Sequence, residues 1–180
     1  APAAGLTLEG EVNIRPTRSW DLFPKYVFGL ADEEQPEDTR TTLDALPVLN
    51  EQGKAEIPVV LNDLPATTQR LNADIVVRMR EGGGRAVERK LTLPVASDTN
   101  MIGIKPEFDS DNLGENSNAQ FSVIVSDANG KRVTEDGLEW SLVKVERNYQ
   151  WYRSGSSWNY EPVTYTKKVA DGTVTVDEQT

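Results

Sequence analysis

Apolar and polar residues alternate along much of this 180-residue chain, and this alternation restricts the folds that are open to it. Leu6, Leu8, Val12 and Ile14 alternate with polar residues, which predicts a half-buried strand because successive side chains of a strand point to opposite faces. No segment shows a sustained 3.6-residue period bounded by capping residues, so little helix is expected. The sequence therefore predicts an all-β fold.

Further strands are expected at four places in the first half of the chain. Two of them are joined by Gly82, Gly83 and Gly84, which predict a hairpin because glycine accepts the positive φ of a tight turn. Pro58 cannot donate to a sheet ladder, so the strand that contains it is expected at an edge or a bulge. The four predicted strands are residues 26–30, 55–61, 73–79 and 86–93.

A polar, turn-rich stretch at residues 97–100 interrupts the alternation, which then restarts near Ile102. We therefore predict two tandem antiparallel β-sandwich modules of the immunoglobulin or fibronectin type, residues 1–97 and residues 98–180. Expected elements of the second are strands at residues 102–104 and 121–125, a turn at Asn129-Gly130, and a long hairpin formed by residues 138–152 and 161–169. The second module is shorter than the roughly 100 residues of a seven-strand sandwich, so its completeness is left open.

Composition excludes several classes of protein. With neither Cys nor His, the chain has no thiol nucleophile, no Cys/His zinc site and no Ser-His-Asp triad. Its net charge is −10, and neither half offers the basic face that nucleic-acid binding requires. The stretch at residues 109–114 begins like a calcium loop, but Leu113 and Gln120 occupy ligand positions, so an acidic turn is predicted. We therefore expect that the chain is not an enzyme and that it binds no cofactor, no metal and no nucleic acid.

Five aromatic residues near the tip of the predicted long hairpin are its most distinctive feature: Tyr149, Trp151, Tyr152, Trp158 and Tyr160. One interpretation is a binding role, in which they stack on sugar rings or anchor a protein partner. The other is a packing role, in which they pack on each other or on a neighbouring module. A short loop around Gly155 predicts that Trp151 pairs with Tyr160 and that Arg153 faces Trp158. Alternation then places Tyr152 on the face opposite Tyr149, Trp151 and Tyr160.

Two stretches carry a resemblance to a known family. The sequence Leu6-Thr7-Leu8-Glu9-Gly10-Glu11-Val12, with Tyr26-Val27-Phe28-Gly29-Leu30 downstream, resembles a macroglobulin-type module of a bacterial alpha-2-macroglobulin. Residues 140–153, followed by Trp158-Asn159-Tyr160, are similar to the segment that such proteins carry around their bait region. The resemblance covers nearly the whole chain.

The resemblance implies a bacterial endopeptidase inhibitor of the periplasm, a defensive protease trap tethered to the inner membrane as a lipoprotein. In that family a protease cuts a bait segment, and a Cys–Gln thioester then captures the protease. Because this chain has no Cys, the resemblance reaches the structural scaffold and not the reactive centre. Expected partners are host or foreign endopeptidases through the full-length parent, neighbouring modules and the peptidoglycan-synthesis machinery. The alternative is a carbohydrate- or peptidoglycan-binding module that uses the aromatic hairpin.

Overall fold

The computed structural model describes residues 4–79, 86–109, 113–114 and 116–178. Within these residues every regular element is a strand and all strand pairs are antiparallel, which confirms the predicted all-β class. The chain divides into two compact units, Ala1–Arg132 and Val133–Thr180.

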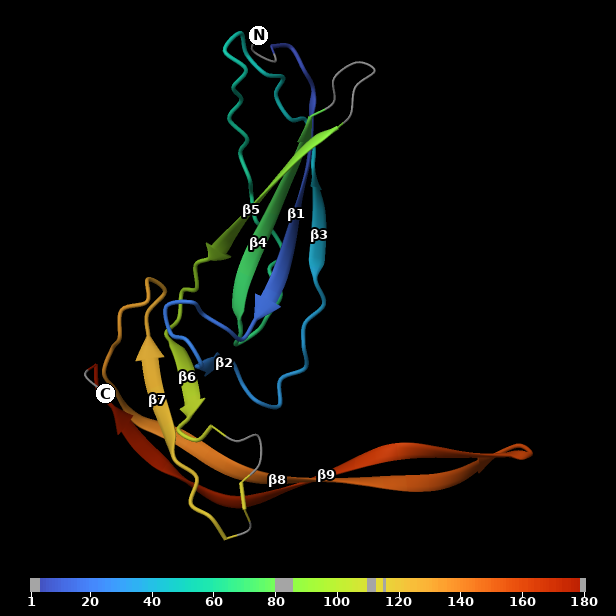
Figure 1. Ribbon diagram of the computed structural model, residues 1–180, viewed down its shortest axis with the longest axis vertical. Helices are drawn as coiled ribbons and strands as arrows, with labels where there is room; N and C mark the ends of the chain where they lie inside the picture. The colour runs from blue at the N-terminus through green and yellow to red at the C-terminus, as the bar shows by residue number, and fades with distance from the viewer. Residues whose placement is uncertain (1–3, 80–85, 110–112, 115, 179–180) are drawn as a thin grey trace. The chain divides into compact units, whose positions relative to one another are not determined.

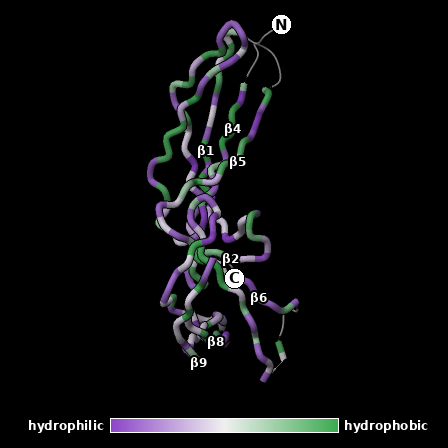
Figure 2. Tube along the Cα trace, turned by 90° about the vertical axis from the view of Figure 1, so that its left-hand side faces the viewer, coloured by the Kyte–Doolittle hydropathy of each residue, from purple (hydrophilic) through white to green (hydrophobic). Residues whose placement is uncertain are grey.

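A four-stranded sheet forms most of the first unit. Its strands are β1 (Leu8–Thr17), β3 (Thr39–Leu43), β4 (Arg70–Met79) and β5 (Val87–Val95), in the order β3-β1-β4-β5 (Figure 1). Hydrophobic and hydrophilic residues alternate at short intervals along these strands (Figure 2), and the inward set includes Val12 and Ile14, which are 3% and 4% exposed. The predicted hairpin of residues 73–79 and 86–93 is confirmed by the β4–β5 pairing; its turn, Gly82 to Gly84, lies outside the described residues.

The predicted strand at residues 55–61 is wrong, because no strand of the described residues includes it. The segment still alternates between half-buried and exposed residues, and Val59 and Leu61 pack against the core formed by Val12, Ile14 and Ala73. Pro58 has no backbone N–H to donate to a ladder. The alternation therefore reflects packing of one side of this segment against the core, without sheet hydrogen bonds.

Asp74 is a buried carboxylate in the middle of the four-stranded sheet, 3% exposed. It accepts hydrogen bonds from Arg15 Nε at 2.5 Å and Thr92 Oγ1 at 2.5 Å, and it pairs with Lys90 Nζ at 3.0 Å. Burial alone raises the pKa of Asp74, but the hydrogen bonds from Arg15, Thr92 and Lys90 outweigh it and lower the pKa to about 2. The buried charge is therefore fully compensated.

The second sheet of the first unit contains strands from before and after residue 97 in the sequence. It comprises β2 (Val27–Phe28), β6 (Met101–Pro106) and β7 (Phe121–Ser126), in the order β2-β6-β7. The strands predicted at residues 102–104 and 121–125 are confirmed, whereas the strand predicted at residues 26–30 is only two residues long. The turn at Asn129-Gly130 is also confirmed: Gly130 has φ +83° and its N–H donates to the Asp127 carbonyl at 3.1 Å.

Aromatic residues from the β1–β2 connection and from β2 fill the core of this second sheet. Trp20, Phe23 and Phe28 contact Met101 and Ile124, and Phe28 is 0% exposed. The Trp20 ring centroid lies 5.2 Å from that of Phe23 and 5.5 Å from that of Phe28, both edge to face. The module boundary at residue 97 stays a prediction, because this core joins residues from both sides of it.

The second unit is dominated by one long hairpin. Strands β8 (Glu135–Ser154) and β9 (Ser157–Val176) run side by side as a two-stranded ribbon that ends in a tight turn (Figure 1). The hairpin predicted from residues 138–152 and 161–169 is confirmed, and both strands extend beyond those limits.

Candidate interaction surface on the β8–β9 ribbon

The register of the ribbon fixes which of its side chains share a face. Trp151 pairs with Tyr160 and Arg153 with Trp158, which confirms the predicted register and places the turn at Gly155 and Ser156. Gly155 has φ +63°, a conformation that favours glycine. Tyr152 pairs with Asn159 and therefore lies on the opposite face, as the alternation predicts.

One face of the tip half of the ribbon is mostly aromatic and apolar, and we call it the distal aromatic face. Its four large rings are Tyr149, Trp151, Trp158 and Tyr160, which are 65%, 67%, 66% and 61% exposed. The register places twelve residues on this face: Val143, Val145, Arg147, Tyr149, Trp151 and Arg153 from β8, and Trp158, Tyr160, Pro162, Thr164, Thr166 and Lys168 from β9.

The rings of this face contact one another at steep angles. The Tyr160 centroid lies 5.8 Å from Tyr149 with the planes at 67°, and 5.3 Å from Trp151 with the planes at 51°. The prediction that the aromatic residues pack on each other is confirmed for these three. A sugar-stacking platform needs ring faces in one plane, so this geometry does not favour the carbohydrate interpretation.

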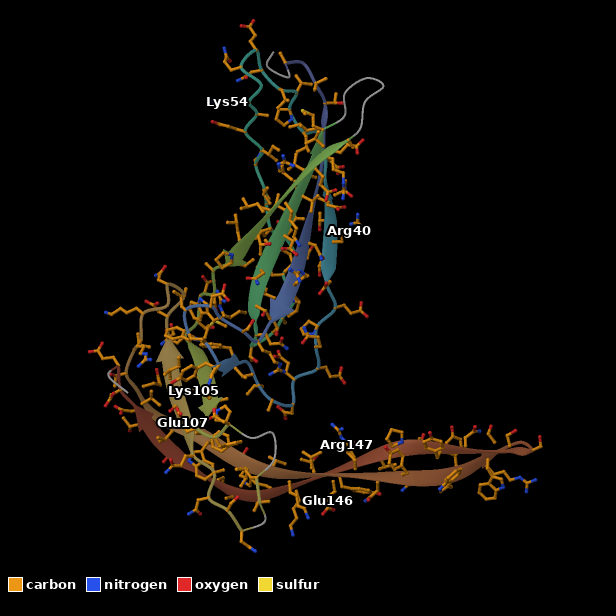
Figure 3. The ribbon with its side chains drawn as sticks, in the orientation of Figure 1. Arg40, Lys54, Lys105, Glu107, Glu146 and Arg147 are labelled. Atoms are coloured by element: carbon orange, nitrogen blue, oxygen red, sulfur yellow. The ribbon has the colours of Figure 1, made fainter. Side chains whose placement is uncertain are left out.

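No carboxylate belongs to the distal aromatic face, while Arg147, Arg153 and Lys168 do. Glu146, the neighbour of Arg147, lies on the other side of the ribbon (Figure 3), where it pairs with Lys144 Nζ at 2.5 Å. The Arg153 Nε–H donates to the Gly155 carbonyl at 3.0 Å, which holds the side chain against the turn. Lys168 pairs with Asp171 at 3.4 Å, so the two arginines carry the uncompensated positive charge of the face.

The apolar face of the ribbon changes sides partway along its length. Leu142 pairs with Ala170 and Val143 with Lys168, which leaves Val169 as one extra residue in β9. On the near side of this β-bulge the apolar residues are Leu138, Trp140 and Leu142, on the face opposite to the distal aromatic face. The ribbon therefore carries apolar residues on one face before the bulge and on the other face beyond it.

Sequence reasoning identified the aromatic residues but missed their companions. Val143, Val145 and Arg147 continue the distal aromatic face toward the bulge, and counting back by two from Tyr149 would have found them. The predicted set also included Tyr152, which the structure places apart from the other four rings. That the five aromatics contact a partner stays a prediction.

Neither a metal site nor a membrane-spanning helix is found among the described residues. The acidic turn at residues 109–114 lies partly outside the described residues, and those that are described contain no group of three or more His, Cys, Asp or Glu residues arranged to hold a metal. No helix in the described ranges has the length and apolar character to cross a membrane.

Two family models match the chain. Residues 1–97 match the bacterial alpha-2-macroglobulin MG5 domain, and residues 103–180 match bacterial macroglobulin domain 6. Among curated proteins, the chain is similar to alpha-2-macroglobulin of Escherichia coli K12, with 29% identity over 84% of this chain. It is also similar to alpha-2-macroglobulin of Xylella fastidiosa Temecula1, with 26% identity over 89% of this chain.

Solved structures agree in fold. Salmonella alpha-2-macroglobulin reacted with methylamine superposes with a TM-score of 0.73 over 100% of this chain at 22% identity. The native conformation of the E. coli protein gives a TM-score of 0.69 over 98% of this chain, also at 22% identity. The chain spans 10% of the length of the two curated relatives and 12% of each of these solved chains.

Proposed function

Because the chain belongs to the bacterial alpha-2-macroglobulin family, we propose that it supplies two non-catalytic structural modules of a periplasmic endopeptidase inhibitor. Their task in the full-length parent is to hold neighbouring parts in a fixed relation, so that cleavage of a bait segment is transmitted as a movement of whole modules. The trapping chemistry itself belongs to other parts of the parent, since this chain has no Cys.

The observation that carries this proposal is the joint between the residues that the two family models match. Strand β2 lies within the first match, yet it pairs with β6, where Val27 faces Ile104 and Phe28 faces Gly103. Trp20 and Phe28 enter one core with Ile124. A shared sheet and a shared aromatic core resist hinge motion far better than a flexible linker.

Polar contacts support the same joint from the side of the four-stranded sheet. The Arg70 guanidinium stacks over the Trp20 ring, 3.9 Å from its centroid. Glu33 accepts hydrogen bonds from the Thr68 N–H and the Thr68 hydroxyl, both at 2.8 Å, and these bonds, with the backbone one contributing most, lower the pKa of Glu33. Both contacts tie the β2 region to the start of β4.

Location and partners extend the proposal. A protease trap of this kind meets host or foreign endopeptidases through the full-length parent, and we place it in the periplasm, tethered to the inner membrane as a lipoprotein. Contact with the peptidoglycan-synthesis machinery belongs to the same proposal. The support is family membership alone.

The joint can be tested in the full-length parent with pancreatic elastase, since a related E. coli protein has been solved in a form activated by porcine elastase. A Cβ at Gly103 would lie 2.8 Å from the Phe28 ring, whereas one at Gly114 would meet nothing within 4 Å. We expect Gly103→Ala to loosen the joint and lower the elastase trapped per molecule, and Gly114→Ala to leave it unchanged. Full trapping by a Gly103→Ala protein whose β2 amides exchange rapidly would overturn the proposed role.

The 180-residue chain alone provides a second test. It should form no covalent adduct with elastase, because it lacks the thiol from which a thioester is made. Time-dependent, stoichiometric protection of a large substrate by this chain would contradict the division of labour proposed here.

A further inference from the structure

We propose that the distal aromatic face is a docking surface for an acidic, apolar-centred protein surface contributed by another part of the same parent polypeptide. The inference rests on the proposed function, because it takes the partner from the remainder of the trap. It goes beyond that function by assigning the surface and the chemistry of what covers it.

The ribbon needs a partner to be stable. An isolated two-stranded hairpin is at best marginally stable in water, and three or more strands or a packed layer are needed for independent stability. In the described part of the chain β8 and β9 form a sheet with no third strand. The face nevertheless presents four large rings that are each more than 60% exposed, together with Val145 at 55%.

The residue composition of the distal aromatic face matches that of a protein interface. Tyr, Trp and Arg are the residues most enriched at the energetic centres of such interfaces, whereas Asp, Glu and Lys are depleted there. The face has two Tyr, two Trp and two Arg, and its one Lys lies at the edge next to the bulge. Three of the four rings contact one another, since Tyr160 contacts both Tyr149 and Trp151.

The positive charge of the face favours an acidic partner. Arg147 and Arg153 lie on this face with no carboxylate among its twelve residues, in a chain whose net charge is −10. A face of one sign selects a partner of the other sign and rejects like-charged surfaces. The occupant should therefore place carboxylates opposite the two arginines and apolar side chains opposite the rings.

The polarity of the tip favours a protein partner over a lipid bilayer. The face runs lengthwise from Val143 to Trp158, while the tip itself is polar, with Ser154, Gly155, Ser156 and Ser157. Insertion of the tip into a membrane would bury this polar turn first, at a cost for each unsatisfied group. A lengthwise contact along a protein surface buries the rings and leaves the turn in water. Because the chain spans about a tenth of its curated relatives, most of the parent lies outside it and can supply that surface.

The test uses the full-length parent with a benzophenone amino acid at single positions of the ribbon. Tyr149 is the probe position on the distal aromatic face, and Asn148, its neighbour on the opposite face, is the matched control. After irradiation of the purified protein, cross-linked peptides are mapped by mass spectrometry. We expect Tyr149 to give one dominant intramolecular cross-link to a segment that carries carboxylates, and Asn148 to give none to that segment.

A second variant tests the charge without altering the rings. Arg147→Glu should abolish the cross-link from Tyr149, and changing the carboxylates of the mapped segment to Lys should restore it. An unchanged cross-link in Arg147→Glu would overturn the charge argument, and circular dichroism and gel filtration establish that each variant is folded.

Several other outcomes would overturn the proposed docking surface. Equal labelling from Tyr149 and Asn148, or no cross-linked peptide in a folded protein, means that nothing covers the face. Cross-links between two copies make it a self-association surface. Cross-links only to lipid, in vesicles of phosphatidylethanolamine and phosphatidylglycerol, make it a membrane contact. A protein that gives the expected cross-link but traps no elastase would refute the proposed function and leave the docking surface standing.

Discussion

Trp140 lies directly across from Gly172 in the β8–β9 ribbon, and its indole covers the place where a Cβ of Gly172 would stand, with three ring atoms at 3.1 Å. A glycine in a strand leaves the backbone without a side chain to pack, and an aromatic ring on the paired strand can fill that space. The two residues therefore act as one unit on the face that also carries Leu142.

This relationship predicts non-additive stability in the 180-residue chain. Trp140→Ala should lower the free energy of unfolding more in the wild-type chain than in a chain that also carries Gly172→Val. The valine side chain would shield the backbone that the indole shields in the wild type. The expected coupling is about 0.5–1 kcal/mol, the usual size for directly opposed strand residues. Denaturant melts of both single variants and the double variant measure it, and a coupling near zero would show that the ring only happens to lie there.

The joint core predicts a clash that can be relieved. Gly103→Ala would place a methyl group 2.8 Å from the Phe28 ring and 3.2 Å from Ile124, and Phe28 is fully buried. We expect a loss of about 1–3 kcal/mol, the usual cost of overpacking a core. Adding Phe28→Leu should recover part of it, while Gly114→Ala should stay within about 0.5 kcal/mol of wild type. A Gly103→Ala protein as stable as the Gly114→Ala control would contradict the packing.

The buried Asp74 predicts a pH dependence. Its pKa is lowered from 3.8 to about 2 on folding, so its charge stabilises the fold above the unfolded pKa, and this contribution is lost as the pH falls from about 4 to about 2. A shift of this size corresponds to about 2 kcal/mol. Asp74→Asn should lower stability at neutral pH and flatten the stability profile across that acid range. Parallel profiles for wild type and Asp74→Asn would contradict the assignment.

Trp151→Ala should have little effect on the stability of the 180-residue chain. The ring is 67% exposed and contacts the Tyr160 ring, so the expected loss is about 0.5–1 kcal/mol, the range of a cross-strand aromatic pair. In the full-length parent the same change should cost more if the distal aromatic face is covered. Calorimetry of both forms compares the two, and a loss of about 3 kcal/mol or more in the short chain would show that the ring is buried there.

Limited trypsin digestion should cut after Lys54 before Arg40. The polar composition of residues 32–42 predicts an exposed loop with a cleavage site at Arg40, and this prediction is wrong. Arg40 (labelled in Figure 3) belongs to β3, where it faces Asn13 and forms an ion pair with Glu11. Lys54 follows an exposed turn outside any strand, and exposed loop tips are preferred cleavage sites. Mass spectrometry of early fragments decides the order. Arg85, which follows the predicted glycine turn and is a second cleavage site expected from the sequence, lies outside the described residues.

The sequence predicted the long strands well because their alternation is local. A period of two specifies a face without reference to the rest of the chain, so β1, β4 and the pairing of Trp151 with Tyr160 followed from spacing and turn chemistry. The same signal misled at residues 55–61, where the alternation reflects one-sided burial of a segment that belongs to no described strand. Periodicity reports which side is covered, and hydrogen bonding has to be decided separately.

The joint and the charge of the candidate surface could not be predicted locally. That β2 pairs with β6 depends on Phe28 meeting Ile124, a contact between residues nearly a hundred positions apart. β3 was missed because its residues are mostly exposed, as in an edge strand whose polar side chains hide the pattern. The bulge at Val169 leaves no local signature, since valine fits a regular strand equally well.

That single extra residue also determines how the ribbon tolerates changes in length. Removing Val169 would leave every flanking pair in place, because Leu142 and Val143 already face Ala170 and Lys168 on either side of it. Removing a different β9 residue would shift the pairing by one residue between the deletion and Val169, where the extra residue absorbs the shift. Only the side chains in that interval would move to the opposite face of the ribbon. Single-residue gaps among relatives should therefore gather near this position and become rare toward Trp158, where a deletion would carry most of the aromatic strand to the wrong side.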